Sequence, residues 1–305
     1  MKNAFLRDLT KHKVTYLLAL PGILAVLVFN YLPMVGIVIA FQDFIPFKGI
    51  LGSEFVGLEN IRFFLATGEW KQVTINTIFL NVLFIGTSTV FAIMLAIMIT
   101  EISGKLFIRV TQSLMILPNF LSWAIVAVMS SAFLSSDTGI FNSILSKLGF
   151  DTINFYAESG YWPLILTIFK VWKASGFAAI IYIAAITGID PSIYESATLD
   201  GASKFQCIKN ITLPSITGTI VILALLDVGK IFYGDFGMIY TLVGDNPVLL
   251  DKTDVIDTFV YRALRTSGRM GYAAAVGLFQ SVLGFVIVIA ANWGAKKINP
   301  DYGLF

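Results

Sequence analysis

The chain has 305 residues, of which 57% are hydrophobic and 13% charged, and its formal net charge is +2. Soluble domains carry roughly 25% charged residues, so this composition favours a membrane protein. One cysteine, Cys207, and one histidine, His12, exclude an internal disulfide and a zinc site. No basic stretch is dense enough to indicate a nucleic-acid partner.

Six apolar segments are long enough to cross a bilayer as helices, because about 20 residues rising 1.5 Å each cover roughly 30 Å of hydrocarbon. In chain order they are Val14–Phe41, Val73–Thr100, Ile108–Leu134, Tyr161–Thr187, Leu213–Phe236 and Tyr272–Trp293. Continuous apolar runs favour helices over the short alternating strands of a β-barrel. The sequence therefore predicts an all-α membrane protein with a six-helix domain at 14–293, between an N-terminal segment at 1–13 and a C-terminal tail at 294–305.

The first apolar segment follows four basic residues, as the core of a secretory signal would. These residues are Lys2, Arg7, Lys11 and Lys13. The segment is too long for a signal core, lacks an obvious cleavage site and precedes five more spans, so we interpret it as a membrane helix. Lys and Arg are slightly more frequent on the side of the two termini, which predicts that both termini are cytoplasmic. We expect a multi-pass membrane protein.

Between the fourth and fifth spans, the sequence predicts two short helices joined by a bend. Asp190 is a good N-cap, and Pro191 suits the first helical position because its missing N–H costs nothing there. Gly201 ends this helix easily, since it adopts a left-handed backbone that other residues resist. Ser203 followed by Gln206 matches a capping box that starts a second helix. We expect a structured cytoplasmic elbow.

This elbow, residues 190–211, resembles a signature of the permeases of binding-protein-dependent ABC importers. That signature is Glu-Ala-Ala, Asp-Gly-Ala and Ile-x-Leu-Pro, and at the same spacing this chain has Glu195-Ser-Ala, Asp200-Gly-Ala and Ile211-Thr-Leu-Pro214. The resemblance implies the type I ABC importer permease fold, in which the elbow is a coupling helix that docks on a cytoplasmic ATPase. The residues that it implies for ATPase coupling are Glu195, Ala197, Asp200, Gly201, Ala202, Ile211, Leu213 and Pro214.

The alternative is that the elbow is an ordinary loop between two helices. Two departures from the family pattern are small in volume: Ser196 replaces the usual first alanine, and Ile208 replaces a common phenylalanine. They leave the expected docking role in place.

Other stretches make the chain similar to the permeases of carbohydrate importers. Trp172-Lys-Ala-Ser-Gly176 precedes the elbow. Tyr31-Leu-Pro33, Gly57-Leu-Glu-Asn60 and Asp254-Val-Ile-Asp-Thr-Phe-Val-Tyr261 look closest to a branch that serves oligosaccharides and polysaccharide fragments. The resemblance implies a translocation path for such a sugar. The alternative is the same architecture serving a non-sugar solute such as an amino acid.

The resemblance also implies a place in the bacterial cytoplasmic membrane and a set of partners. The partners are a second permease in a heterodimer, two ATPase subunits and an extracellular solute-binding protein. A phosphate-binding Walker loop is missing at Gly104-Lys105, because Ile99 stands where the loop needs glycine and Leu106 where it needs Ser or Thr. We expect no catalytic residue, metal or cofactor in this chain, and expect ATP and Mg²⁺ to be used by the ATPase subunits.

Charged residues inside a bilayer are rare and usually face a cavity or a partner. Lys170 and Lys173 lie three residues apart in the fourth predicted span, at about 13 to 18 Å from its outer end. Asp227 and Lys230 have the same spacing in the fifth, so each pair is expected on one helical face. One interpretation is that these four residues line a polar cavity for sugars, including acidic ones. The alternative is that Asp227 forms an interhelical ion pair with one of the lysines.

Aromatic and amide side chains are further candidates for the path. Trp123 and Trp172 could stack on a sugar, whereas Trp162 at a span edge is expected in the interfacial belt. Amides within the spans, at Asn81, Asn119 and Gln280, more often bond neighbouring helices than substrates.

Two other classes of protein are compatible with six spans. An intramembrane enzyme would use Asp227 or the lysines and would turn over without ATPase partners. A passive channel would conduct solute without ATP. Neither needs a shaped segment for docking an ATPase, so the elbow argues against both.

Overall fold

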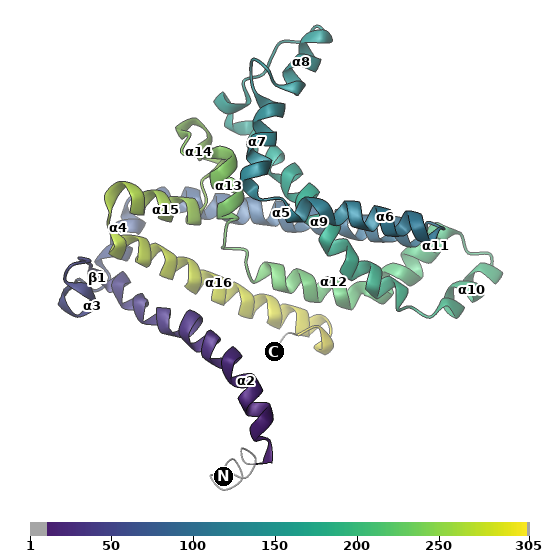
Figure 1. The fold of residues 1–305 in the computed structure, drawn as a ribbon, viewed down its shortest axis with the longest axis horizontal. Helices are drawn as coiled ribbons and strands as arrows, with labels where there is room; N and C mark the ends of the chain where they lie inside the picture. The colour runs from purple at the N-terminus through teal and green to yellow at the C-terminus, as the bar shows by residue number, and fades with distance from the viewer. Residues whose placement is uncertain (1–10, 304–305) are drawn as a thin grey trace. The chain divides into compact units, whose positions relative to one another are not determined.

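The computed structural model describes residues 11–303, and helices dominate this part of the chain (Figure 1). Within it, five helices are long and apolar enough to cross a membrane, and a sixth crossing is possible as a helix pair bent by 96°. The five run over Lys13–Phe41, Glu69–Thr100, Ser159–Thr187, Lys204–Val228 and Met270–Lys297. The all-α membrane fold is confirmed. Lys2, Arg7 and most of the predicted segment 1–13 lie outside the described residues.

The chain divides into two compact units. The first contains the described residues up to 67 together with 263–278, and the second contains 68–262 and 279 onward. Two helices belong to both units, α15 (Ile256–Ser267) and α16 (Met270–Ile298). The remaining elements of the first unit are α2 (Lys13–Val26), η1 (Leu27–Tyr31), η2 (Leu32–Phe41), β1 (Gln42–Asp43), α3 (Gly49–Gly52), β2 (Glu54–Phe55) and α4 (Glu59–Ala66).

The second unit holds most of the helices. Its remaining elements are α5 (Glu69–Thr100), α6 (Lys105–Ile116), η3 (Leu117–Phe120), α7 (Trp123–Leu134), α8 (Ile140–Lys147), η4 (Phe155–Ala157), η5 (Ser159–Tyr161), α9 (Trp162–Thr187), α10 (Pro191–Leu199), α11 (Lys204–Cys207), η6 (Ile208–Thr212), α12 (Leu213–Val228), α13 (Phe236–Val243), α14 (Pro247–Thr253) and η7 (Pro300–Tyr302). The predicted tail at 294–305 starts inside a helix, because α16 continues to Ile298.

In the first unit, a small antiparallel hairpin follows the first spanning helix. Gln42 of β1 lies opposite Phe55 of β2. The side-chain amide of Asn60 donates to the carbonyl oxygens of Ala40 and Gln42 at 3.1 and 3.0 Å. Gly57 has a φ of +61°, which an L side chain rarely adopts. The motif at 57–60 therefore has a local structural reason, because it turns the chain and holds the end of η2.

In the second unit, α5 and α9 pack along each other and form the core with shorter elements (Figure 1). One apolar cluster joins Leu80 and Phe84 of α5 to Leu166 of α9 and to α7, α13 and α14. A second cluster joins Ala92, Ala96 and Ile99 of α5 to Ala179, Tyr182, Ile183 and Ile186 of α9 and Ile216 of α12. Small side chains in the second cluster let the two helix backbones approach closely.

The third predicted span, Ile108–Leu134, is wrong as a continuous helix. Helix α6 with η3 meets α7 at a bend of 96°. Pro118 has no N–H to donate and disfavours a continuing helix. Ser122 then starts α7 as its N-cap, accepting a hydrogen bond from Ile125 N–H at 3.4 Å. The apolar composition hid this break.

The fifth predicted span, Leu213–Phe236, is displaced toward the elbow. The helix begins at Lys204 and passes through the π-turn η6 into α12 without a break, so the second short helix of the predicted elbow is the start of this span. The helix ends at Val228. Asp227 and Lys230 therefore do not share a helical face, because Lys230 lies beyond the end of α12.

Candidate functional site

The elbow starts with the predicted cap. The carboxylate of Asp190 accepts a hydrogen bond from Ser192 N–H at 2.9 Å, and Pro191 occupies the first turn of α10. Hydrogen bonds from the backbone and side chain of Ser192 lower the pKa of Asp190, because they stabilise its charged form. Asp190 thus fixes where the chain leaves the fourth span.

The elbow turns at Gly201, as predicted, with a φ of +82°. Ala202 N–H donates to the Ala197 carbonyl at 2.9 Å and Gly201 N–H to the Thr198 carbonyl at 3.1 Å, which completes a Schellman motif. Ser203 and Gln206 form the predicted capping box. Every step of this bend is locally encoded, which is why the sequence was sufficient to predict it.

The elbow exposes apolar side chains. Helix α10 has no buried residue and stands at one end of α9 and α12 (Figure 1). Leu199 and Phe205 are 89% and 73% exposed, and Ile193 is also exposed. Glu195, Asp200 and Gly201 are exposed beside them. A surface of exposed apolar and acidic side chains is suited to a protein partner.

The elbow is also tied to the spans that flank it. Tyr194 and Thr212 share a hydrogen bond of 2.9 Å between their hydroxyls, which links α10 to η6. Lys204 forms an ion pair of 2.9 Å with Glu101, the residue after α5. Between these contacts lies a groove of about 620 Å³, lined by Thr100 and residues of both parts of the elbow. These contacts link the elbow to the ends of the spans that flank it.

Of the other predicted elbow residues, Ala197 and Ala202 are half-buried in the turn. Ile211 and Leu213 are also half-buried, and Pro214 is exposed at the first turn of α12. These residues lie in the turn at Gly201 or where η6 joins α12.

A polar cavity of about 670 Å³ lies between α5, α9, α12 and the segment that follows α12. The charged residues that line it are Lys170, Asp227, Lys230 and Asp235. Lys170 Nζ and the Asp235 carboxylate form an ion pair of 2.9 Å. The predicted pairing of Asp227 with a lysine is wrong: among the described residues, neither Asp227 nor Lys230 has an ion-pair partner within 4.0 Å.

The remaining predicted path residues lie elsewhere. Lys173 Nζ donates to the Asn119 carbonyl at 2.7 Å and lies 5.3 Å from the centroid of the Trp123 ring, so it holds the bend between η3 and α7. Trp172 lines a separate, largely apolar groove of about 690 Å³ between α5, α6 and α9. Trp162 is fully buried and donates to the Phe155 carbonyl at 2.8 Å, so its assignment to an interfacial belt was wrong.

Side chains from α5 and α16 bond the non-helical backbone at 229–235. Asn81 donates to the carbonyls of Ile231 and Tyr233 at 3.0 and 3.2 Å. Gln280 donates to the Phe232 carbonyl at 2.6 Å. Unpaired backbone groups are costly at membrane depth, so these bonds allow the chain to unwind beside the cavity. Asn81 and Gln280 were expected to bond neighbouring helices, and the carbonyls that they bond belong instead to the non-helical segment after α12.

Asp257 holds the same segment from α15. Its carboxylate accepts hydrogen bonds from Gly234 N–H and from the Gln280 amide, the latter at 3.2 Å. Burial raises the pKa of Asp257, while these two donors act in the opposite direction. A Cβ on Gly234 would lie 2.5 Å from Val255 Cγ2, so only glycine fits there.

Asp235 is the cavity residue that the sequence analysis missed. It caps α13, accepting from Met238 N–H at 3.1 Å through one carboxylate oxygen while the other binds Lys170. The signal was present in the sequence, because an acidic residue after Gly229 and Gly234 marks a helix break and a new N-terminus. The fifth span was predicted from hydropathy alone, and it therefore ran past Asp235 to Phe236.

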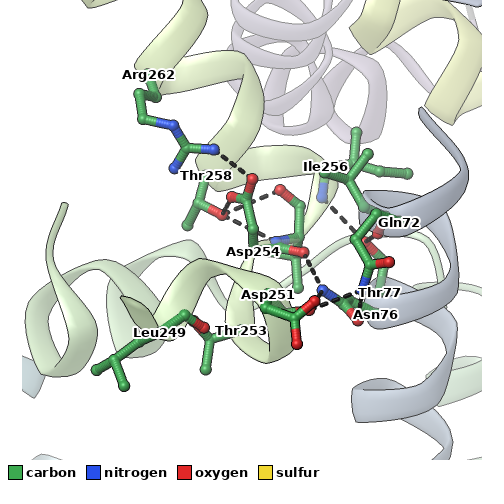
Figure 2. Close-up of polar contacts among 12 residues, drawn as sticks. Gln72, Asn76, Thr77, Leu249, Asp251, Thr253, Asp254, Ile256, Thr258 and Arg262 are labelled. Carbon is green, nitrogen blue, oxygen red and sulfur yellow. Dashed lines mark hydrogen bonds and ion pairs between the residues drawn. The ribbon is translucent and has the colours of Figure 1, made fainter. Parts of the chain in front are cut away.

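A second polar network ties α5 to α14 and α15 (Figure 2). Asn76 donates to the carbonyls of Asp251 and Asp254 at 3.0 and 3.1 Å. The buried carboxylate of Asp254 binds the Arg262 guanidinium and accepts from the Thr258 hydroxyl at 2.7 Å. Burial raises the pKa of Asp254, and Arg262 and Thr258 partly offset this. The motif at 254–261 thus anchors α15 to the start of a spanning helix.

Together these features define a class: a multi-pass helical membrane protein with a polar cavity among its spans and a shaped elbow at one end. Residues 88–300 match the model of a family described as the binding-protein-dependent transport system inner membrane component. The chain belongs to this family of transport permeases.

Two relatives match almost the whole chain. The polygalacturonan/rhamnogalacturonan transport system permease protein YteP of Bacillus subtilis (strain 168) is 36% identical over 98% of this chain and 93% of its own length. Protein LplB of the same organism is 33% identical over 99% of this chain and 94% of its own length. These matches also cover most of the chain before residue 88, which the family model does not match.

Solved structures share the fold. A chain of a bacterial ABC transporter involved in the import of the acidic polysaccharide alginate has a TM-score of 0.87 and 33% identity, over 97% of this chain and 99% of its own. A bacterial alginate ABC transporter in complex with an alginate pentasaccharide-bound periplasmic protein also has a TM-score of 0.87, with 34% identity over 96% and 97%.

Proposed function

We propose that this chain forms part of the membrane path of an ATP-driven importer for an acidic oligosaccharide or polysaccharide fragment. The observation that carries the proposal is the polar cavity of about 670 Å³, which is lined by the cations Lys170 and Lys230 together with Asp227 and Asp235. A cation inside a membrane protein is suited to a substrate that carries carboxylates. The two relatives with polysaccharide names, for polygalacturonan/rhamnogalacturonan and for alginate, support a sugar rather than an amino acid.

The elbow is proposed as the site that couples the path to ATP hydrolysis. Its exposed Leu199 and Phe205 would dock on a cytoplasmic ATPase with Glu195 beside them. Two ATPase subunits, which use ATP and Mg²⁺, would close and push α10, and the linked spans would then open the cavity to one side or the other. Both termini are cytoplasmic in this arrangement.

The chain works with further partners in this proposal. A second, similar permease completes the path as a heterodimer, and an extracellular solute-binding protein delivers the sugar. The periplasmic protein bound to the alginate transporter supports the delivery step. Lys173, Trp123 and Trp172 do not line the polar cavity and are proposed to support the surrounding helices and not to bind sugar.

The substrate class is tested by uptake into proteoliposomes that contain the assembled importer. Labelled trigalacturonate should accumulate only with ATP inside and binding protein outside, and a labelled amino acid should not. Uptake that is independent of ATP would identify a channel instead. Turnover of the sugar by the purified chain alone would identify an enzyme.

The docking role is tested by co-purification of the ATPase. Leu199→Asp places a charge at the exposed tip of α10 and is expected to abolish recovery of the ATPase with the permease. Thr152→Asp adds the same charge to an exposed loop at the predicted outer side and should leave recovery unchanged. Normal recovery with Leu199→Asp would move the docking site away from the elbow.

A further inference from the structure

The cavity contains one ion pair whose two partners have different roles in the fold. Lys170 comes from the middle of α9, while Asp235 is the N-cap of α13. The Asp235 carboxylate uses one oxygen for Met238 N–H at 3.1 Å and the other for Lys170 Nζ at 2.9 Å. Both side chains are about three-quarters buried, with 29% and 23% exposed. The pair is therefore accessible from the cavity.

The charges that face the cavity balance one another. Lys170 and Lys230 supply two positive charges, and Asp227 and Asp235 supply two negative ones. Lys230 has no ion-pair partner within 4.0 Å among the described residues, whereas Lys170 is paired with the Asp235 carboxylate. A carboxylate that binds Lys170 must therefore displace Asp235, and this step does not arise at Lys230.

We propose that a carboxylate of the acidic sugar displaces Asp235 from Lys170, so that Lys170 binds substrate and Asp235 is a built-in competitor. This inference rests on the proposed function and assigns a residue to its substrate preference. A neutral sugar cannot replace a carboxylate at an ammonium group, so only an acidic sugar gains binding energy from this exchange. Selectivity comes from the exchange and not from net charge.

The fold allows this exchange without collapse. When Lys170 leaves, Asp235 keeps its bond to Met238 N–H, and the segment before it stays bonded to Asn81, Asp257 and Gln280. The start of α13 is therefore held independently of the ion pair.

The test compares two labelled probes in proteoliposomes, trigalacturonate and the same trimer with its carboxyl groups reduced to alcohols. Lys170→Gln should lower uptake of trigalacturonate about tenfold or more, because one partner of a close charge pair is removed, and should leave uptake of the reduced trimer unchanged. Asp235→Asn keeps a good N-cap for α13 and should lower the KM for trigalacturonate several-fold by removing the competitor.

The double variant separates substrate binding from structure. If the pair only stabilises the fold, Lys170→Gln lowers uptake of both probes equally, and adding Asp235→Asn restores both. If Lys170 binds the sugar carboxylate, the double variant stays as poor with trigalacturonate as Lys170→Gln. Lys173→Gln lies three residues along the same helix but bonds the Asn119 carbonyl, so it should change uptake of both probes by the same factor.

The outcomes also separate the two proposals. If the wild-type importer takes up trigalacturonate and Lys170→Gln takes it up equally well, the proposed exchange is wrong and the proposed function still stands. Wild-type importer that takes up only the reduced trimer, or neither probe, overturns the acidic substrate and the exchange together.

Discussion

Gly176 of α9 lies directly against the backbone of Met115 in α6. A Cβ placed on Gly176 would be 1.9 Å from the Met115 carbonyl oxygen and 2.6 Å from the carbonyl carbon. Both atoms are backbone, so neither can rotate away as a flexible side chain would. The first half of the broken span thus packs on α9 at a point where no side chain fits.

Gly176→Ala should therefore loosen the contact between α6 and α9. Overpacking costs about 1–3 kcal/mol, and a clash with backbone lies at the upper end of that range. The melting temperature of the detergent-purified complex should fall, and more so for Gly176→Val. Gly86→Ala in α5 is the matched control, because a Cβ there has no atom within 4 Å. Equal melting temperatures for the two alanine variants would contradict the predicted clash.

Gly201 tests the bend of the elbow by conformation alone. A Cβ on Gly201 has no atom within 4 Å, yet the φ of +82° disfavours L residues by about 1–2 kcal/mol. Sugar-stimulated ATPase activity should fall in the order Gly, Asn, Ala, Val, because Asn tolerates this backbone better than the other two.

The control for the bend is Gly188→Ala. Gly188 ends α9 with a φ of −81°, and a Cβ there meets its nearest neighbour at 3.5 Å, an ordinary contact. Its stimulated ATPase activity should match wild type. If Gly201→Ala is as active as Gly188→Ala, the left-handed turn is not needed for coupling.

The features that could be predicted from sequence are the locally encoded ones. The second, fourth and sixth spans follow from apolar length alone and agree with the structure to within a few residues at most ends. The elbow follows from Asp190, Gly201 and Ser203, whose partners are two to five residues away in sequence. Local hydrogen bonds need no knowledge of the rest of the fold.

The features that could not be predicted depend on distant segments. The partner of Lys170 is 65 residues away. The burial of Trp162 depends on α13 and α14 packing over α9, which no pattern within the span indicates. The break after Val228 is tolerated because Asn81 and Gln280 reach its carbonyls from other helices. The apolar sequence around Val228 does not indicate that side chains of other helices bond its backbone carbonyls.

Arg262 gives a test that depends on pH. Arg262→Gln leaves the buried carboxylate of Asp254 without its cation, which should cost about 3 kcal/mol at neutral pH. Burial already raises the pKa of Asp254, and loss of Arg262 raises it further. For an acid whose pKa is higher in the folded state, stability is greatest below the unfolded pKa and falls as pH rises through the folded pKa.

The melting temperature of Arg262→Gln should therefore recover as the pH is lowered from 8 toward 5. The double variant Asp254→Asn with Arg262→Gln has no buried carboxylate and should lack this recovery. If the difference in melting temperature between Arg262→Gln and wild type stays constant across that pH range, the Asp254 carboxylate is not the cause of the lost stability.

Gln280 tests whether side chains make the unwound segment possible. Gln280→Met keeps the side-chain volume but removes the donor to the Phe232 carbonyl and to Asp257. Leaving a buried carbonyl unsatisfied costs about 1–3 kcal/mol, so the melting temperature of the complex should fall. Val282→Met is a control on the same helix, because Val282 is 53% exposed. Since the segment at 229–235 ends at Asp235, Gln280→Met should also weaken trigalacturonate uptake more than Val282→Met does. An unchanged melting temperature with Gln280→Met would mean that the backbone of this segment needs no partner from α16.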